Sequence, residues 1–166
     1  MSGTSLDGVD AALTEFIEVA GQGLKSKVLK TYTLPFSRAL REELLALHES
    51  GQNEMHRTAM VSNQLAEIYA EAVNGLLREA NIQPSQVAAI GCHGQTIRHQ
   101  PELGENLAYT HQTLNAALLA EKTGIDVIAD FRSRDLAAGG HGAPLVPAFH
   151  AQQFATDKNI AVLNLG

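Results

Sequence analysis

The sequence has 166 residues, of which 45% are hydrophobic and 18% charged, and a formal net charge of −6. This charged share lies below the ~25% typical of soluble domains, so the chain can bury a substantial core as one domain or one lobe of a larger protein. The absence of a lysine- or arginine-rich stretch argues against nucleic-acid binding, and no apolar run approaches the ~20 residues of a membrane span. The single cysteine, Cys92, excludes an internal disulfide and fits the cytoplasmic location that we expect.

The opening ten residues, Met1–Asp10, combine two glycines, three hydroxyl residues and two aspartates. Glycines permit tight turns, and hydroxyls and backbone amides can face an anion. Asp7 can hold hydrated Mg²⁺, so the stretch suits the phosphates of a nucleotide. The alternative is an ordinary β-turn, because Asp-Gly is a common hairpin dipeptide.

A β-hairpin follows this opening. Alternation of apolar residues over Val9–Val19 predicts a strand with one buried face. A turn at 21–23 then leads into a more exposed strand at Lys25–Leu34. We expect Pro35 to end the hairpin and to start a helix that stops at Gly51.

A long amphipathic helix comes next, capped by Asn53 and closed by Asn81 and Pro84. It has about seven turns. Its apolar stripe, which we expect to face the core, consists of Val61, Leu65, Ile68, Ala72 and Leu76.

The second half of the chain alternates apolar runs with helices. Three runs predict buried strands: Val87–Cys92, Ile125–Asp130 and Asn159–Leu165. Helices are predicted at Leu114–Lys122, with Gly124 just after it, and at Val146–Phe154. The order predicts an α/β fold, in which a mixed sheet of an antiparallel hairpin plus parallel strands is flanked by helices. Ligands of such sheets bind beyond the carboxyl ends of the parallel strands.

Polar residues stand where the first two buried strands end. His93, Gln95 and Thr96 lie in one predicted loop whose neutral donors and acceptors suit sugar hydroxyls, or serve only as a polar loop. Cys92 ends an apolar run and is predicted to be a small core residue. After the second strand, Asp130 can meet a ligand and Arg132 can bind a carboxylate or phosphate with two donors.

Each of these polar stretches has a structural alternative. Asp130, Arg132, Arg134 and Asp135 can instead form a local ion-pair network. The glycine-rich stretch 138–144 can cradle an anion with its amides or can be a flexible loop. The histidine spacing disfavours a metal site, and the chain lacks the phosphate-loop, dinucleotide and nucleophile-elbow motifs.

Taken together, the motifs resemble the anhydro-N-acetylmuramic acid kinases, a family of the sugar-kinase, heat-shock-protein and actin superfamily. The matching stretches are Met1–Asp10, Ile90–Thr96, Thr123–Arg132 and Gly142–His150. The resemblance implies a ribonuclease H-like, actin-like ATPase lobe of a two-lobed kinase. Such enzymes convert 1,6-anhydro-N-acetylmuramic acid, ATP and water to N-acetylmuramic acid 6-phosphate and ADP in peptidoglycan recycling. They are cytoplasmic and, as a rule, homodimeric.

The resemblance also implies roles for individual residues. The ATP phosphates would be bound by the opening hairpin, with Asp7 positioning Mg²⁺. The residues of that hairpin are Gly3, Thr4, Ser5, Leu6, Asp7, Gly8, Val9 and Asp10. The sugar would be bound by His93, Gln95, Thr96, Asp130 and Arg132. Among these, we expect Arg132 to bind the lactyl carboxylate of the muramyl group.

The chain also departs from the family pattern. His111–Leu114 replaces a stretch that usually contains a glycine, and a leucine resists a positive φ. Because family chains are more than twice as long, we expect residues 1–157 to be the first lobe and 158–166 the first strand of a second. The base carboxylate is expected after Gly166, and the 166 residues alone are expected not to turn over. The alternatives are another sugar kinase of the superfamily or a non-catalytic lobe that binds carbohydrate or nucleotide.

Overall fold

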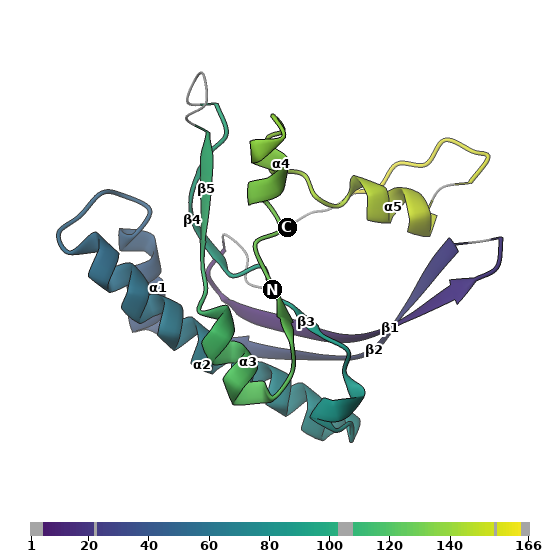
Figure 1. Ribbon diagram of the computed structural model, residues 1–166, viewed down its shortest axis with the longest axis horizontal. Coiled ribbons are helices and arrows are strands. Elements are labelled where there is room, and N and C mark those ends of the chain that lie inside the picture. Colours follow the sequence, from purple (N-terminus) through teal and green to yellow (C-terminus); the bar gives the residue numbers. More distant parts are fainter. Residues whose placement is uncertain (1–4, 22, 103–107, 155, 164–166) are drawn as a thin grey trace.

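The longest element of the computed structural model is helix α2, Glu54–Ala80, against which several of the other elements pack (Figure 1). The structure describes residues 5–21, 23–102, 108–154 and 156–163. The predicted stripe of α2 faces the core: Val61, Leu65, Ala72 and Leu76 are buried and Ile68 packs against them. Asn53 precedes the helix as predicted but adopts a left-handed conformation and makes no capping bond through its side chain.

The predicted hairpin is present as β1, Gly8–Val19, and β2, Gly23–Pro35, which pair antiparallel. Gly21 and Gly23 have positive φ, as a tight turn requires, while Gln22 lies outside the described residues. Two close contacts position this hairpin. Within it, Gly8 has no room for a Cβ, which would lie 2.5 Å from the Leu34 carbonyl oxygen, and between it and α2, Gly75 lies under the Tyr32 ring.

The prediction of one buried face along the whole of β1 was wrong for its distal half. Val9 is buried, but Ile17 is 49% exposed. A bulge between Leu13 and Thr14 interrupts the register, and the distal half of the hairpin projects beyond α2 (Figure 1). A bulge shifts the alternation of a strand, and α2 is the layer that buries the proximal half.

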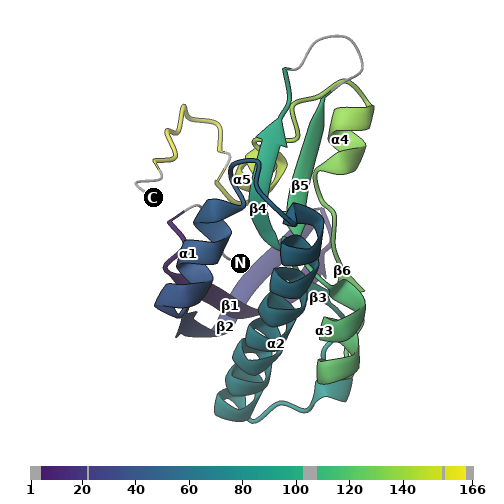
Figure 2. The ribbon, with the colours of Figure 1, turned by 90° about the vertical axis from the view of Figure 1, so that its left-hand side faces the viewer.

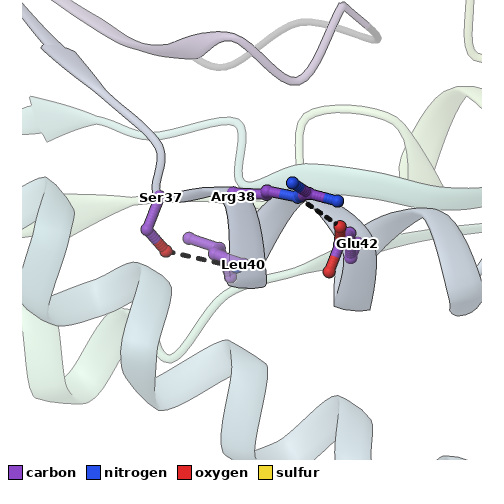
Figure 3. A network of polar contacts seen from close by, with 4 residues as sticks. All are labelled: Ser37, Arg38, Leu40 and Glu42. Carbon is purple, nitrogen blue, oxygen red and sulfur yellow. Dashed lines mark hydrogen bonds and ion pairs between the residues drawn. The ribbon is translucent and has the colours of Figure 1, made fainter.

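Helix α1, Arg38–Ala46, begins three residues later than predicted. Pro35 is the last residue of β2, and Ser37 caps the helix by accepting a bond from the Leu40 amide at 3.2 Å (Figure 3). On the same helix, Arg38 Nε and Glu42 Oε1 form an exposed ion pair of 2.7 Å. A second pair, Arg57 with Glu43 at 2.7 Å, joins α1 to α2, and the bond from Arg57 lowers the pKa of the Glu43 carboxyl.

The two middle strands are shorter than predicted. A 3₁₀ turn, Pro84–Gln86, leads into β3, Ile90–Gly91, which pairs in parallel with β6, Val127–Ile128. Neither is covered on both faces, since Ile90 is half-buried and Ile128 is exposed. Between them, helix α3, Ala116–Thr123, packs beside α2 and ends at Gly124, as predicted (Figure 2).

The segment after Cys92 is a hairpin rather than a loop. Its strands are β4, Gln95–Gln100, and β5, Tyr109–Thr113, with part of the connection, 103–107, outside the described residues. The predicted α/β class with antiparallel and parallel strands flanked by helices is confirmed, and the described strands form three separate two-stranded pairs.

The C-terminal part contains α4, Ser133–Ala137, which was not predicted, and α5, Pro147–Phe154, which was. Helix α4 lies beside β5, and α5 lies beside β2 (Figure 1). The prediction of a buried strand at 159–165 was wrong for the described residues 159–163, which are exposed and have no strand partner. An apolar run needs both a ladder partner and a covering layer to become a buried strand.

Candidate functional site

The described part of the opening loop is a turn anchored in the core. Leu6 adopts a left-handed conformation, φ 54°, and buries its side chain, while the Phe36 amide donates to the Asp7 carbonyl at 3.0 Å. Because Leu6 and Val9 point into the core, only their backbone groups remain for a ligand. Gly3 and Thr4 lie outside the described residues.

Two carboxylates of this loop are exposed. The Ser5 hydroxyl donates to Asp7 Oδ1 at 2.7 Å, and this bond lowers the pKa of the Asp7 carboxyl. Asp7 is therefore an ionised oxygen donor at neutral pH. Asp10 instead accepts a bond of 2.6 Å from the Thr33 hydroxyl on the neighbouring strand, so one of its roles is to join β1 to β2.

A polar pocket of about 280 Å³ lies between β5 and the start of α4. It brings together two residues that the sequence predicted to bind a ligand, His93 and Asp130. Its other lining residues are Thr110, His111, Gln112, Leu114, Ala116, Ala129 and Ser133. None of the described loop residues 5–10 lines it.

His93 and Arg132 form the central contact beside this pocket. Arg132 Nε donates to His93 Nε2 at 2.7 Å, and Arg132 Nη1 donates to the Gly142 carbonyl at 2.5 Å. The other imidazole nitrogen, Nδ1, lies 2.9 Å from the Gly94 carbonyl, to which it donates if Nε2 is the acceptor. Burial lowers the pKa of His93, and the Arg132 cation lowers it further, so the imidazole is neutral at pH 7.

The alternative of an ion-pair network over residues 130–135 is wrong for these described residues. Asp130, in a left-handed conformation, uses Oδ1 to accept a bond from the Ser133 amide at 3.2 Å. Asp135 accepts a bond of 2.7 Å from the Gly142 amide. The glycine-rich stretch 138–144 therefore binds an anion, which is the Asp135 carboxylate of the same chain.

The remaining predicted residues lie deeper in the molecule. Gln95 is fully buried, with Nε2 donating to the Thr96 carbonyl at 3.4 Å, and it does not line the pocket. Thr96 reaches the pocket indirectly, because its hydroxyl accepts a bond of 3.2 Å from Gln112. Cys92 is buried as predicted, and burial raises the pKa of its thiol.

Sequence reasoning missed the contribution of β5. Thr110, His111 and Gln112 line the pocket because β5 pairs with β4, a long-range contact with no local signal. Leu114 lies in the stretch where the family usually has a glycine. It is not strained there, because its φ is not positive. Instead Gly94, with φ 72°, packs so tightly that its Cβ would lie 2.9 Å from the Thr113 carbonyl oxygen.

Comparison with known proteins assigns the chain to a family. The family model described as anhydro-N-acetylmuramic acid kinase matches residues 1–166. The chain belongs to the anhydro-N-acetylmuramic acid kinase family. Its sugar-kinase and actin-like ATPase fold agrees with the α/β arrangement of strand pairs and helices described above.

Three relatives illustrate the family, and each covers the whole of this chain. The protein from Bordetella petrii is 58% identical and that from Albidiferax ferrireducens 56%, and in both cases the chain covers 42% of the relative. The protein from Nitrosomonas europaea is 52% identical, with 44% of its length covered. All three are named anhydro-N-acetylmuramic acid kinase, and the chain spans less than half of their length.

Two further findings concern the described residues only. They contain no group of three or more histidine, cysteine or acidic side chains placed to hold a metal ion. No helix among them has the length and apolar character that crossing a membrane requires.

Proposed function

We propose that the protein to which this chain belongs is an ATP-dependent kinase that acts on 1,6-anhydro-N-acetylmuramic acid. Water attacks the anomeric carbon and opens the anhydro bridge, and the freed 6-oxygen takes the γ-phosphoryl group of ATP. The products are N-acetylmuramic acid 6-phosphate and ADP. The observation that carries this proposal is the family match over all 166 residues, and the polar pocket beside His93 supports it.

The opening loop is proposed to face the ATP phosphates. Its donor set fits them, because the Ser5 hydroxyl, the turn amides and the ionised Asp7 carboxylate all stand at an exposed turn. Asp7 would hold Mg²⁺, which would offset the negative charge of the phosphates. Mg²⁺ usually takes only one or two protein carboxylates, so the lack of a larger acidic cluster in the described residues is compatible with this role.

The pocket beside β5 is proposed to bind the sugar. His93 and Asp130 line it, and His111 and Gln112 add further polar groups. His93 would hold Arg132 in place, so that the guanidinium presents its remaining N–H groups to the lactyl carboxylate. Thr96 would act through Gln112, and Gln95 would support the strand from within.

A product assay on the full-length protein tests the reaction. Incubation with ATP, Mg²⁺ and the anhydro-sugar in ¹⁸O-labelled water should give a 6-phosphate with one ¹⁸O at the anomeric carbon. A panel of other sugars should react much more slowly. Phosphorylation of a different sugar at the higher rate would contradict the assigned substrate, and the absence of any phosphorylation would contradict the kinase.

Replacement of Asp7 tests the phosphate loop. In the full-length protein, Asp7→Asn should lower kcat/KM for ATP roughly 10- to 100-fold, because a neutral amide holds Mg²⁺ poorly. The loss should shrink as Mg²⁺ is raised, which a purely structural defect would not do. The matched control Glu15→Gln removes an exposed charge from β1, the strand that follows Asp7, and should leave the rate unchanged.

Replacement of Arg132 tests the carboxylate site. Arg132→Ala in the full-length protein should weaken calorimetric binding of the anhydro-muramyl sugar about tenfold or more. Binding of the lactyl-free anhydro-N-acetylglucosamine should change much less. Unchanged binding of the muramyl sugar would show that Arg132 only braces His93 and Gly142.

We further propose that residues 1–157 belong to a first lobe and 158–166 to a second, and that the protein is a cytoplasmic homodimer. The catalytic base is assigned to the part of the protein after Gly166. The 166-residue chain alone should therefore give no phosphorylated sugar, and detection of product from it would contradict this division. Sedimentation of the full-length protein tests the dimer.

A further inference from the structure

The glycine-rich stretch 138–144 is bonded twice to one residue of α4, Asp135. The Asp135 carboxylate accepts the 2.7 Å bond from the Gly142 amide, and the Asp135 backbone carbonyl accepts a bond of 2.8 Å from the Gly140 amide. Gly142 has φ 68°, a conformation that glycine adopts at little cost. Of the two bonds, only the one to the carboxylate depends on the side chain at position 135, and this bond holds Gly142.

Gly140 leaves the space that this carboxylate occupies. A Cβ at Gly140 would collide with Asp135 Oδ2. Gly140 is not among the positive-φ glycines of the described chain, so alanine suits its backbone conformation and only the collision opposes it. The variant Gly140→Ala would therefore displace the carboxylate from the Gly142 amide while keeping its charge in the protein.

The Gly142 carbonyl connects this anchor to Arg132. It accepts the 2.5 Å bond from Arg132 Nη1, while His93 Nε2 accepts the bond from Arg132 Nε. A guanidinium is planar and rigid, so acceptors at two of its nitrogens fix both its position and its plane. With the His93 bond alone, the plane could rotate about that contact. Among the described residues, none accepts a bond from Nη2, so this end of the guanidinium is available to a ligand.

Asp135 acts on Arg132 without bonding to it. The described residues show no ion pair between the two side chains. A carboxylate bonded directly to Arg132 would occupy N–H groups that a ligand carboxylate needs. Because Asp135 is bonded to the Gly142 amide instead, it can orient the guanidinium and still leave Nη2 to the ligand.

We propose that Asp135 is a positioning residue for Arg132, and that it gives the site its preference for a sugar that carries a carboxylate. This inference rests on the proposed function, in which Arg132 binds the lactyl carboxylate. Asp135 holds Gly142 and the Gly142 carbonyl holds Nη1, so the guanidinium is oriented before the ligand arrives. Such preorganisation lowers the entropy cost of binding. The lactyl group is not among the reacting atoms, so the effect falls on affinity rather than on kcat.

Calorimetric binding of two sugars to the full-length protein tests this inference. Asp135→Ala should weaken binding of the anhydro-muramyl sugar roughly tenfold, because one hydrogen bond to a charged group is lost. Binding of the lactyl-free anhydro-N-acetylglucosamine should change less than about twofold, as should kcat. Asp135→Asn should restore most of the affinity, because its amide oxygen can accept the bond from Gly142. The matched control Arg134→Ala removes an exposed side chain from the same helix and should leave both affinities unchanged.

Two further variants separate positioning from a general structural role. Gly140→Ala should weaken binding of the muramyl sugar as Asp135→Ala does. The double variant Asp135→Ala, Arg132→Ala should bind no more weakly than Arg132→Ala alone, since the two residues act as one unit. Additive losses in the double variant would overturn the inference. Equal weakening for both sugars would also overturn it, because that result indicates a displaced loop.

The same measurements distinguish this inference from the proposed function. If Arg132→Ala weakens binding of the muramyl sugar and Asp135→Ala does not, the inference is wrong and the proposed carboxylate site stands. If neither variant weakens it, the carboxylate site itself is wrong, and the role of Asp135 is wrong with it.

Discussion

The body of the molecule, residues 5–128 as far as they are described, and its C-terminal segment, residues 129–163, are held in place by different forces. All the buried apolar side chains of the described residues lie in the body, from Leu6 to Ile125. The C-terminal segment exposes its large apolar side chains instead: Phe131, Leu145, Val146, Phe149, Phe154, Ile160, Val162 and Leu163.

Polar contacts position the C-terminal segment. Arg132 donates to His93, and the Gln152 side chain donates to the Leu24 carbonyl of β2 at 2.8 Å. Such bonds fix geometry but contribute little net free energy compared with apolar burial. Apolar packing in the body therefore determines whether the chain folds. The C-terminal segment can open locally at a lower cost in free energy.

The largest expected effect is the loss of a core side chain from the body. Leu65 on α2 is fully buried, so Leu65→Ala should lower the free energy of unfolding by about 3 kcal/mol. Phe149→Ala, which removes a larger side chain that is 46% exposed, should change it by less than about 0.5 kcal/mol. Urea unfolding of both variants measures the difference. Equal losses would show that the C-terminal segment shares the core.

A smaller effect is expected from helix capping. Ser37→Ala removes the cap of α1, drawn in Figure 3, and should lower the free energy of unfolding by about 1 kcal/mol. The neighbouring variant Arg38→Ala breaks an exposed ion pair and should cost no more than about 0.5 kcal/mol.

Asp130→Ala frees the Ser133 amide of α4 and should speed hydrogen exchange there without changing global unfolding. A global loss from Asp130→Ala would contradict the distinction between body and segment.

The smallest expected effect is a pH dependence in the contact between the two regions. Because the pKa of His93 is lowered on folding, the unfolded chain takes up a proton first as the pH falls through about 6.5. Stability therefore falls with decreasing pH in that window, and full protonation removes the acceptor of the Arg132 bond. The protection factors of the α4 amides, which correct for the pH dependence of intrinsic exchange, should fall between pH 7.5 and 5.5. His111 and Asp130 line the same pocket and face this contact.

Two variants separate His93 from other titrating groups. His93→Ala should abolish the pH dependence of this protection over α4, while His56→Ala removes an exposed histidine of α2 and should leave it unchanged. If His93→Ala retains the full dependence, the protonation of another group controls the contact.

Sequence reasoning succeeded where a local pattern determines burial and failed where strand pairing decides the structure. The helical spacing of Val61, Leu65 and Leu76 predicted α2 because a long amphipathic stripe leaves one solution for burial. The polar run Gln95–Gln100 gave no such signal, and it became a strand through its pairing with β5. The prediction for the apolar run 159–163 was wrong for the opposite reason. Its pattern indicates a strand, but no described segment pairs with it.

For the candidate site, the sequence indicated His93, Asp130 and Arg132, because polar residues at strand ends are informative on their own. It did not indicate that Arg132 contacts His93, or that Asp135 occupies the glycine-rich stretch. These contacts depend on how loops from distant strands meet, and residue types alone do not determine that.

The close approach at Gly8 has a consequence for how the protein can change over time. A methyl group there would strike the Leu34 carbonyl and push β1 away from β2. Asp7 immediately precedes Gly8, so the exposed carboxylate and the close approach of the two strands depend on the same turn. A residue with a side chain at position 8 would therefore require the turn that holds Asp7 to rearrange.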